Sequence, residues 1–328
     1  MKRRPIVAAL SAVGVVLALA FAVQASEPET VFDETFPVKA GYRLAVEVSD
    51  MNVEVKTGRE GEARVVVSIT SDHARKRFGE SGFEARLEGE ELVVRTREHR
   101  RWFFNWGVVL HEGSVDVTVT IPERFDVSVQ TGDGNLVAGG IEGRLELATS
   151  DGDVVLGKLR GPSITARSSD GDVRAEELSA DQIEVKTSDG DINLESVTGK
   201  EVRMTTSDGS IVADRVNADV IFARTSDGDI RLTVSGKEIT ARTSDGSIDL
   251  TTEGAMAIEA HTSDGDITLH LPSDLDAELD LRGESVRVGG DIRLKGRVDD
   301  DMVEGTLNNG GPTVRARTSD GVVAIRFD

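Results

Sequence analysis

Short stretches in which every second residue is apolar recur through the middle of the chain, and they fall into two sets. The first set lies just before a serine: Ile164 and Ala166, Ile183 and Val185, Val202 and Met204, Ile221 and Ala223, Ile239 and Ala241, Ile258 and Ala260. The second lies just after an Asp-Gly pair: Val154 and Leu156, Val173 and Ala175, Ile192 and Leu194, Ile211 and Ala213, Ile230 and Leu232, Ile248 and Leu250, Ile267 and Leu269. Such alternation is typical of a β-strand with one face in a core. The pattern therefore predicts two short strands in each unit.

The units repeat with a nearly constant period. The phrase Thr-Ser-Asp-Gly-Asp at residues 187–191 recurs in close variants, and its first aspartate returns after 18 or 19 residues each time. Two short strands cannot close a core alone, so the units are expected to stack as an all-β, single-stranded β-solenoid with parallel sheets. Each coil should run as strand, sharp corner, strand and loose return. An antiparallel sandwich is the alternative, but it predicts fixed turns at both strand ends, and only one end carries Asp-Gly.

The regions on either side of the regular repeats are strand-like but irregular. Residues 26–130 are expected to form an N-terminal β cap region, with a degenerate corner at residues 49–52 and a short capped helix between Ser71 and Gly79. The regular solenoid is expected at residues 131–270, followed by degenerate repeats at 271–328. Within this last segment, alternation from Val314 to Ile325 predicts a closing coil with which the solenoid ends.

The first 25 residues have the layout of a secretory signal peptide. Three basic residues precede an uncharged, mostly apolar run from Ile6 to Val23, and cleavage is expected after Ala25. An uncleaved membrane anchor is the alternative, because the run has 18 residues, the lower limit for a span. With cleavage, no membrane insertion is expected, and the mature chain would be periplasmic, extracellular or attached to the cell surface.

Composition narrows the choice of partners. The chain has no cysteine, so no disulfide framework is available, and its formal net charge is −21. Removal of the three basic residues of the signal brings that charge to −24. Such an acidic chain is a poor partner for nucleic acid or an anionic membrane. Cations, cationic surfaces and neutral glycans fit it better.

The repeated aspartates have two readings. In the first, glycine supplies a positive φ at the corner and aspartate caps the free N–H groups of the turn. In the second, stacked carboxylates bind calcium weakly, and the candidate ligands are Asp151, Asp170, Asp189, Asp208, Asp227, Asp245 and Asp264. The first reading explains both residue types without a ligand, so no metal site is assigned and no cofactor is expected. The threonines that open each corner phrase are expected to point inward and close corner hydrogen bonds.

An aromatic run stands apart from the repeat. Both tryptophans of the chain lie in the sequence from Arg100 to Gly107. One reading is a plug over the open end of the solenoid core. The other is an exposed platform on which a sugar ring or a protein partner stacks, and its candidate residues are Arg100, Arg101, Trp102, Phe103, Phe104 and Trp106.

The sequence shows no recognisable catalytic arrangement. It has no nucleophile elbow, no phosphate-binding glycine loop and no HExxH motif. Some β-solenoids are polysaccharide lyases or hydrolases, but here the carboxylates form a uniform ladder, whereas a catalytic site needs one coil to differ from its neighbours. An enzyme is therefore not expected.

Several phrases together carry a resemblance: the signal peptide, the repeated TSDGDI and TSDGSI, VTIP at Val119 to Pro122, and NNGGPTVRARTSDG at Asn308 to Gly321. The chain resembles a bacterial family of exported β-strand-repeat proteins of unknown function that are described as putative adhesins. The resemblance implies an exported, non-enzymatic repeat scaffold that binds an unknown protein or glycan at the cell envelope. The alternatives are a carbohydrate-active β-helix enzyme and a regulatory partner of an envelope signalling system.

Overall fold

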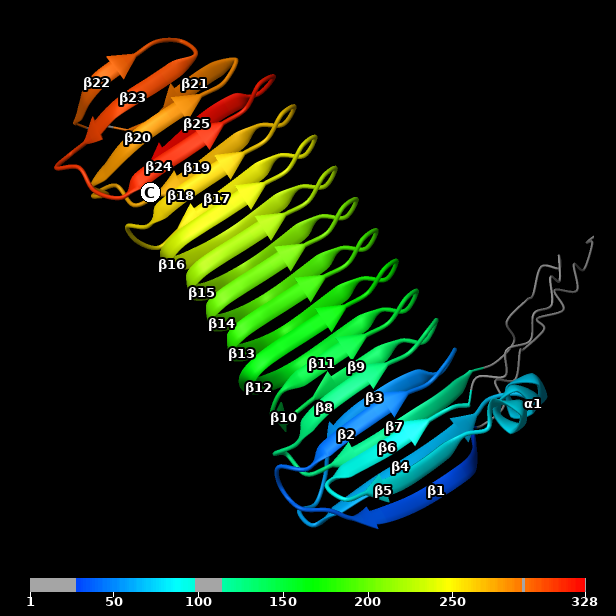
Figure 1. Ribbon diagram of the computed structural model, residues 1–328. Coiled ribbons are helices and arrows are strands. Elements are labelled where there is room, and N and C mark those ends of the chain that lie inside the picture. The colour runs from blue at the N-terminus through cyan, green and yellow to red at the C-terminus, as the bar shows by residue number, and fades with distance from the viewer. Residues whose placement is uncertain (1–27, 98–113, 291–292, 328) are drawn as a thin grey trace, which may run out of the picture.

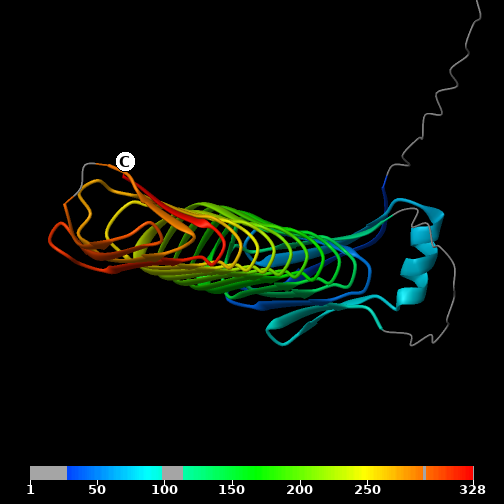
Figure 2. The ribbon, with the colours of Figure 1, turned by 90° about the horizontal axis from the view of Figure 1, so that it is seen from above.

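The computed structural model describes residues 28–97, 114–290 and 293–327. These residues form one long stack of flattened coils, and the one helix among them lies at the end where the chain begins (Figures 1 and 2). Nearly all strand pairs along the stack are parallel and follow the same register. The predicted all-β solenoid is confirmed, and the antiparallel sandwich is excluded.

Five long strands make the regular part of the stack. They are β12 (Val154–Arg167), β13 (Val173–Lys186), β14 (Ile192–Thr205), β15 (Ile211–Arg224) and β16 (Ile230–Arg242). Each one runs from one corner around to the next. We call the stretch after a corner face A (residues 154–156 and their equivalents) and the stretch before a corner face B (residues 164–167 and their equivalents).

The far side of each coil differs from the expectation of a loose return. Leu159 pairs with Leu178, and Leu178 with Val197, so this side continues the parallel ladder. Buried leucines and valines at these positions explain the order, because they add a third apolar side to the core. The shorter repeat is accommodated here too, by a register shift between Ala213 and Val216.

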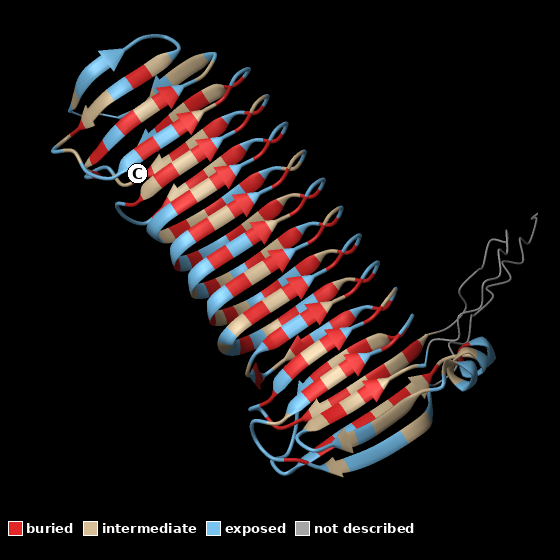
Figure 3. Cartoon of the chain, viewed as in Figure 1, coloured by how far each residue is buried: buried red, intermediate tan, exposed pale blue. Residues whose placement is uncertain are grey.

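The core is a narrow strip inside the coils. Inward residues such as Ile164, Val173 and Ile192 are fully buried, while their neighbours along the strand face solvent (Figure 3). Ala166, Ala223 and Ala241 are also fully buried, and their small side chains let the two faces approach closely. The alternation in the sequence therefore maps onto inside and outside.

The first coil in sequence is not the first in space. β2 (Arg43–Glu47) and β3 (Asn52–Thr57) form a coil whose corner is the predicted degenerate copy. On one side it pairs with β6 (Glu91–Arg95) and β7 (Val115–Ile121). On the other side it pairs with β8 (Asp126–Gln130) and β9 (Leu136–Gly139). The stack then continues through β10 (Ile141–Glu142) and β11 (Leu145–Ala148).

Antiparallel strands and one helix cover this end. β4 (Glu62–Ile69) pairs with β7, β1 (Glu29–Pro37) pairs with β4, and β5 (Glu84–Glu88) pairs with β6. The predicted helix is confirmed as α1 (Asp72–Ser81), with Ser71 accepting a hydrogen bond from the Ala74 N–H. It ends at Gly82 rather than Gly79. The Phe83 ring lies 5.1 Å from Phe32 and 5.4 Å from Phe78, so described aromatic residues pack at this end of the core.

At the other end, the expectation that the solenoid ends with the coil from Val314 to Ile325 is wrong. β17 (Ile248–Thr252), β18 (Ala257–His261) and β19 (Ile267–Leu271) continue the regular stack. The next coil in space is the last in sequence, made of β24 (Thr313–Arg317) and β25 (Val322–Phe327). Beyond it lie the earlier strands β20 (Ala277–Arg282) and β21 (Ser285–Val288). The antiparallel strands β23 (Met302–Leu307) and β22 (Leu294–Val298) finish face B. The repeat phrase at Ser319 explains the insertion, because its N–H donates to the Ser263 carbonyl as a regular neighbour would.

Within residues 28–97, 114–290 and 293–327, no helix has the length and apolar character needed to cross a membrane.

Candidate functional site

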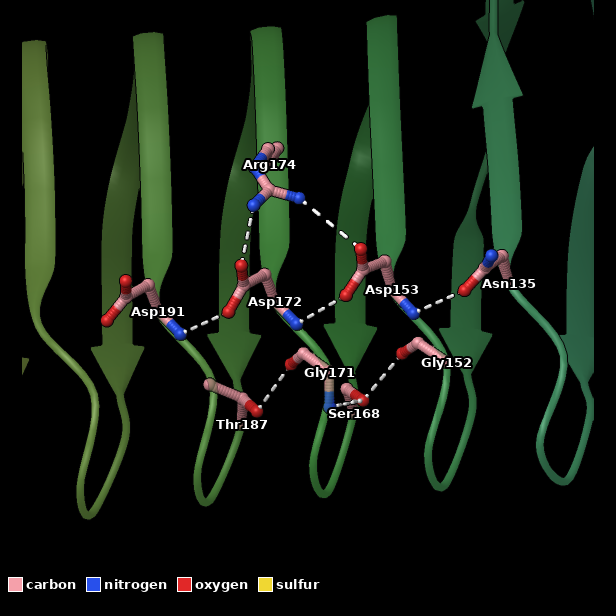
Figure 4. A network of polar contacts seen from close by, with 9 residues as sticks. All are labelled: Asn135, Gly152, Asp153, Ser168, Gly171, Asp172, Arg174, Thr187 and Asp191. Carbon is pink, nitrogen blue, oxygen red and sulfur yellow. Dashed lines mark hydrogen bonds and ion pairs between the residues drawn. The ribbon is translucent and has the colours of Figure 1, made fainter. Parts of the chain in front are cut away.

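The corners are joined by side chains that follow each repeat glycine. Asp153 Oδ1 accepts a hydrogen bond from the Asp172 N–H at 2.9 Å, and Asp172 Oδ1 accepts from the Asp191 N–H at 2.8 Å (Figure 4). Arg174 also bridges the second oxygens of Asp153 and Asp172. We call this the bridging row: Asn135, Asp153, Asp172, Asp191, Ser210, Asp229, Ser247 and Asp266. These side chains satisfy main-chain donors that the turning backbone leaves unpaired.

The threonines that open each corner are buried, as predicted. Thr187 Oγ1 lies 2.9 Å from the Gly171 carbonyl and 3.1 Å from the Ser169 carbonyl of the preceding coil. In the coil before it, Ser168 takes the same role and its hydroxyl also accepts the Gly171 N–H at 3.0 Å (Figure 4). The predicted corner hydrogen bonds are therefore confirmed, and this row is not an outer binding surface.

The reason for the repeat glycines differs from the expected positive φ. None of Gly152, Gly171, Gly190 or Gly209 has a positive φ. A Cβ on Gly190 would instead lie 2.2 Å from the carbonyl oxygen of Gly171 in the preceding coil. Glycine is thus required because adjacent corners pack backbone against backbone.

The first aspartate of each corner does not cap the turn with its side chain. The backbone N–H of Asp170 donates to the Ser150 carbonyl at 2.9 Å, while the carboxylate points to solvent. The corner carboxylates are Asp133, Asp151, Asp170, Asp189, Asp208, Asp227, Asp245 and Asp264. Among the described residues none of them joins an ion pair or accepts a hydrogen bond, and no group of three acidic or histidine side chains could hold a metal ion.

A row of cations lies on face B next to the corners, where it could offset these carboxylates. Arg167 instead pairs with Glu184 at 2.9 Å, and Arg242 pairs with Glu259 at 2.6 Å. Lys186 and Arg224, in the same row, have no partner among the described residues. The corner carboxylates are therefore not paired with this row. The aromatic candidates Arg100, Arg101, Trp102, Phe103, Phe104 and Trp106 lie outside the described residues.

A groove runs along the outer surface of face A, across successive coils. Its volume is about 540 Å³, and it extends over β3, β9, β12, β13, β14 and β15. A smaller hollow of about 340 Å³ continues it toward β7 and shares Glu54 and Val137 with it. Five strand spacings of about 4.8 Å give the groove a length of roughly 24 Å.

The floor of the groove is apolar and open. Val137 and Val155 are 42% and 40% exposed, although outward positions of this row in later coils are mostly polar. The next outward position is Gly139 in one coil and Gly157 in the next, where the following coils carry Glu176 and Glu195. A Cβ on either glycine would meet only ordinary van der Waals contacts at 3.4 Å or more. The fold does not require these two glycines, and their missing side chains deepen the groove.

The polar groups at the N-terminal end of the groove are already paired with one another. Lys56 Nζ donates to Glu54 at 2.9 Å, and Asn52 Nδ2 donates to Asp116 at 2.7 Å. Arg174, farther along, is held by Asp153 and Asp172. Toward β15, Glu195 and Asp214 have no partner among the described residues. The charge that the groove offers a ligand is therefore negative.

Clear pKa shifts of acidic groups lie at the ends of the stack, away from this groove. Hydrogen bonds from Arg64 and Arg95 lower the pKa values of Asp33 and Glu84 below their ordinary range. At Asp280, burial favours the neutral acid, but hydrogen bonds from Arg315 and Arg317 outweigh it and lower the pKa. All three acids are held in the charged form, which is the opposite of what a general acid near neutral pH requires.

Sequence reasoning missed the groove. Its signal was present at Val137 and Val155, because two successive coils carry an outward valine in a row that is mostly polar in the later coils. Gly139 and Gly157 gave a second signal, since they lie outside the corner phrase. Both signals stand out only when the outward-facing positions of successive repeats are compared in the same way as the inward apolar positions.

Comparison with known proteins places the chain in a family. The family model described as Toastrack DUF4097 matches residues 42–238 and 224–326. A search of curated proteins finds no match. A crystal structure named "putative lipid binding protein" from Parabacteroides distasonis has 15% identity and a TM-score of 0.49, and the match covers 74% of this chain and 96% of that one.

Two further solved structures are also similar. A "putative adhesin" from Parabacteroides distasonis has 11% identity and a TM-score of 0.46, with 92% of this chain and 98% of that chain covered. A "putative adhesin" from Bacteroides fragilis has 14% identity and a TM-score of 0.39, with 90% and 96% covered. Because the two matches of the family model together span most of the stack, this chain belongs to the Toastrack DUF4097 family.

Proposed function

We propose that this protein is an exported, non-enzymatic scaffold of the cell envelope that binds an extended segment of a partner protein in the groove on face A. The observation that carries the proposal is the presence of Gly139 and Gly157 in the floor of the groove. The fold does not require glycine at these positions, and their missing side chains open an apolar surface beside Val137 and Val155. An apolar groove with a few converging polar groups is the usual form of a binding site.

The dimensions and charge of the groove describe its ligand. A length of roughly 24 Å accommodates about seven residues of extended polypeptide at about 3.3 Å per residue. Val137 and Val155 offer apolar contact at one end, and the unpartnered Glu195 and Asp214 attract cations at the other. A segment with apolar residues followed by basic residues matches both ends.

A glycan is the weaker match for this groove. Protein sites for sugars commonly use aromatic rings, and none of the residues that line this groove is aromatic. Glu54 and Arg174 in this groove are also engaged with protein partners, so they offer few free hydrogen bonds.

The electrostatics of the described residues support a non-enzymatic role. Among the described residues, the carboxylates repeat from coil to coil without one distinctive cluster. Catalytic groups usually occur where burial and neighbouring charges perturb one residue relative to the others. Export is supported by the apolar N-terminal run and by the acidic composition, which suits an aqueous compartment.

The proposal is tested with labelled heptapeptides and fluorescence anisotropy at low ionic strength. One peptide carries alternating valines and then lysines, and its counterpart carries glutamates in place of the lysines. The lysine peptide should bind, and the glutamate peptide should not. Binding should weaken as salt increases, because the attraction to Glu195 and Asp214 is exposed to screening.

The groove variant is Gly157→Val, which fills the floor with a residue that strands favour. It should retain the melting temperature and lose peptide binding. Thr251→Val is the matched control, since Thr251 occupies an outward position of face A beyond the groove. Equal peptide binding by Gly157→Val and the wild type would contradict the proposal.

A further inference from the structure

Face B carries one aromatic residue where the fold does not need one. Phe222 is the single aromatic residue between Phe125 and Phe327, and it occupies an outward position of β15. The Arg203 guanidinium lies over its ring, 4.7 Å from the centroid. Val220, two residues earlier on the same strand face, is 44% exposed. These three side chains form a partly apolar ridge on an otherwise polar face.

A polar hollow of about 200 Å³ lies on β12, β13 and β14 and reaches the ridge at Arg203. Its outward side chains come from two rows that pair across the three strands. They are Ser163, Thr165, Gln182, Glu184, Glu201 and Arg203. The hollow is on the opposite face from the groove, so the two sites share no residue.

The hydrogen-bonding groups of the hollow divide into charged pairs and free neutral groups. Glu184 pairs with Arg167, and Glu201 pairs with Arg203 at 3.3 Å. The side chains of Ser163, Thr165 and Gln182 have no partner among the described residues. A hydroxyl and an amide both donate and accept hydrogen bonds. The unpaired groups of this hollow are therefore neutral and can act as both donors and acceptors.

We propose that this hollow and ridge bind one or two sugar rings of a neutral saccharide. A sugar ring presents hydroxyls that donate and accept, which matches Ser163, Thr165 and Gln182, and an apolar C–H face, which matches Phe222 and Val220. An acidic sugar is disfavoured, because Glu184 and Glu201 line the same hollow. The inference goes beyond the protein-binding role proposed for face A.

The test measures binding of three tetrasaccharides to the protein by titration calorimetry and saturation-transfer NMR. Two are neutral, made of β-linked glucose or of β-linked N-acetylglucosamine, and the third is made of galacturonic acid. At least one neutral tetrasaccharide should bind, and the acidic one should bind at least tenfold more weakly or not at all. Equal binding of neutral and acidic probes, or no binding of any, would overturn the proposal.

Variants locate the site. Gln182→Leu and Thr165→Val should each weaken binding of the neutral probe by about three- to tenfold, as expected for one lost hydrogen bond. Thr240→Val is the matched control for Thr165→Val, because Thr240 occupies the same outward row outside the hollow. Phe222→Thr removes the ring but leaves Ser163, Thr165 and Gln182 in place, and it should abolish transfer of saturation to sugar C–H protons.

The two proposals fail separately. Saccharide binding that is lost in Gly157→Val but kept in Gln182→Leu would place the sugar in the face A groove, and this inference would be wrong. Peptide binding by Gln182→Leu is expected to equal that of the wild type. A correctly melting Gln182→Leu variant that binds the neutral saccharide as the wild type does would also overturn the inference.

Discussion

Asp172 Oδ1 lies 2.8 Å from the backbone nitrogen of Asp191, the equivalent residue of the next coil. The same contact joins Asp153 to Asp172 and Asp191 to Ser210, so in these three coils one carboxylate oxygen accepts the N–H of the next coil. Where the row contains Asn135, the amide oxygen accepts in the same way. The bridging row thus requires an acceptor at this position, but it does not require a charge.

The bridging contact predicts a difference between two substitutions. Asp172→Ala leaves the Asp191 N–H without its acceptor and also releases Arg174, and should lower the free energy of unfolding by about 1–2 kcal/mol. Asp172→Asn still offers an acceptor, the amide oxygen, and should lower the free energy of unfolding by less than half as much. Urea unfolding followed by circular dichroism measures both, and equal losses would show that the charge matters instead.

The corner glycines predict a steric effect with an internal control. Gly190→Ala places a Cβ 2.2 Å from the Gly171 carbonyl oxygen, so adjacent coils must separate, and the melting temperature should fall markedly. Gly157→Ala meets only ordinary contacts and should leave the melting temperature unchanged or higher, because glycine is a poor strand residue. Similar melting of the two variants would disprove the close-packing explanation.

Because the corner threonine hydroxyls are buried and hydrogen-bonded, replacement of such a threonine by the isosteric valine should lower the free energy of unfolding. In Thr206→Val the carbonyl of Gly190 loses a donor at 3.0 Å, and burial of an unpaired acceptor should cost about 1–3 kcal/mol. Thr205→Val, next to it but outward on face B, should change stability by less than about 0.5 kcal/mol. Thermal unfolding of the pair compares buried and exposed threonine within one corner.

Asp280 predicts a pH dependence at the far end of the stack. Its side chain is 19% exposed and contacts Arg282, Arg315 and Arg317. Because the folded pKa lies below the unfolded value of about 3.9, the carboxylate stabilises the fold above that pH. This contribution is lost as the pH falls through the folded pKa.

Asp280→Asn should therefore melt at a lower temperature than the wild type at pH 7, and the difference should shrink below about pH 4 as the wild-type carboxylate takes up a proton. Asp181→Asn is the control, since Asp181 forms an exposed pair with Lys200 and should have little effect at either pH. A difference that stays constant from pH 7 to pH 3 would contradict the assigned pKa shift.

The corner carboxylates predict a response to salt and calcium. Neighbouring charges about 4.8 Å apart repel by about 1 kcal/mol in water, and no described side chain neutralises them. Replacement of Asp189, Asp208 and Asp227 by asparagine should raise the melting temperature at low ionic strength, and the gain should vanish in about 1 M salt. Millimolar calcium should raise the melting temperature of the wild type more than that of this variant. A calorimetric titration that shows no heat of calcium binding would disprove weak calcium binding by the corner carboxylates.

The fold was predictable because its signal is repeated. The inward alternation, the period and the corner phrase all pointed to the same parallel stack, and the inward threonines followed from their place in the alternation. The role of the glycines was not predictable in the same way. A glycine required for a positive φ and one required for close backbone packing look identical in a sequence, and only the 2.2 Å approach at Gly190 distinguishes them.

The order of coils at the two ends was also beyond the sequence. A corner phrase such as the one at Ser319 fits against any equivalent corner, so its partner at Ser263 depends on which coil remains open in space. The groove on face A was hidden for a related reason. Gly139 and Gly157 stand out in the sequence only as glycines outside the corner phrase, and their effect appears only when two coils lie side by side.

The insertion of the last coil sets an order of events during folding. β24 and β25 follow β20 to β23 in the chain, yet they lie between that segment and the regular stack. While the polypeptide is being made, the coils from β11 to β19 can add one at a time as each emerges, because each packs on the coil before it. The strands β20 and β21 reach their places only when residues 313–327 have arrived to sit beneath them. Completion of this end therefore waits for the final stretch of chain, and an emerging molecule passes through a stage in which the edges of β18 and β19 are open to solvent and to chaperones.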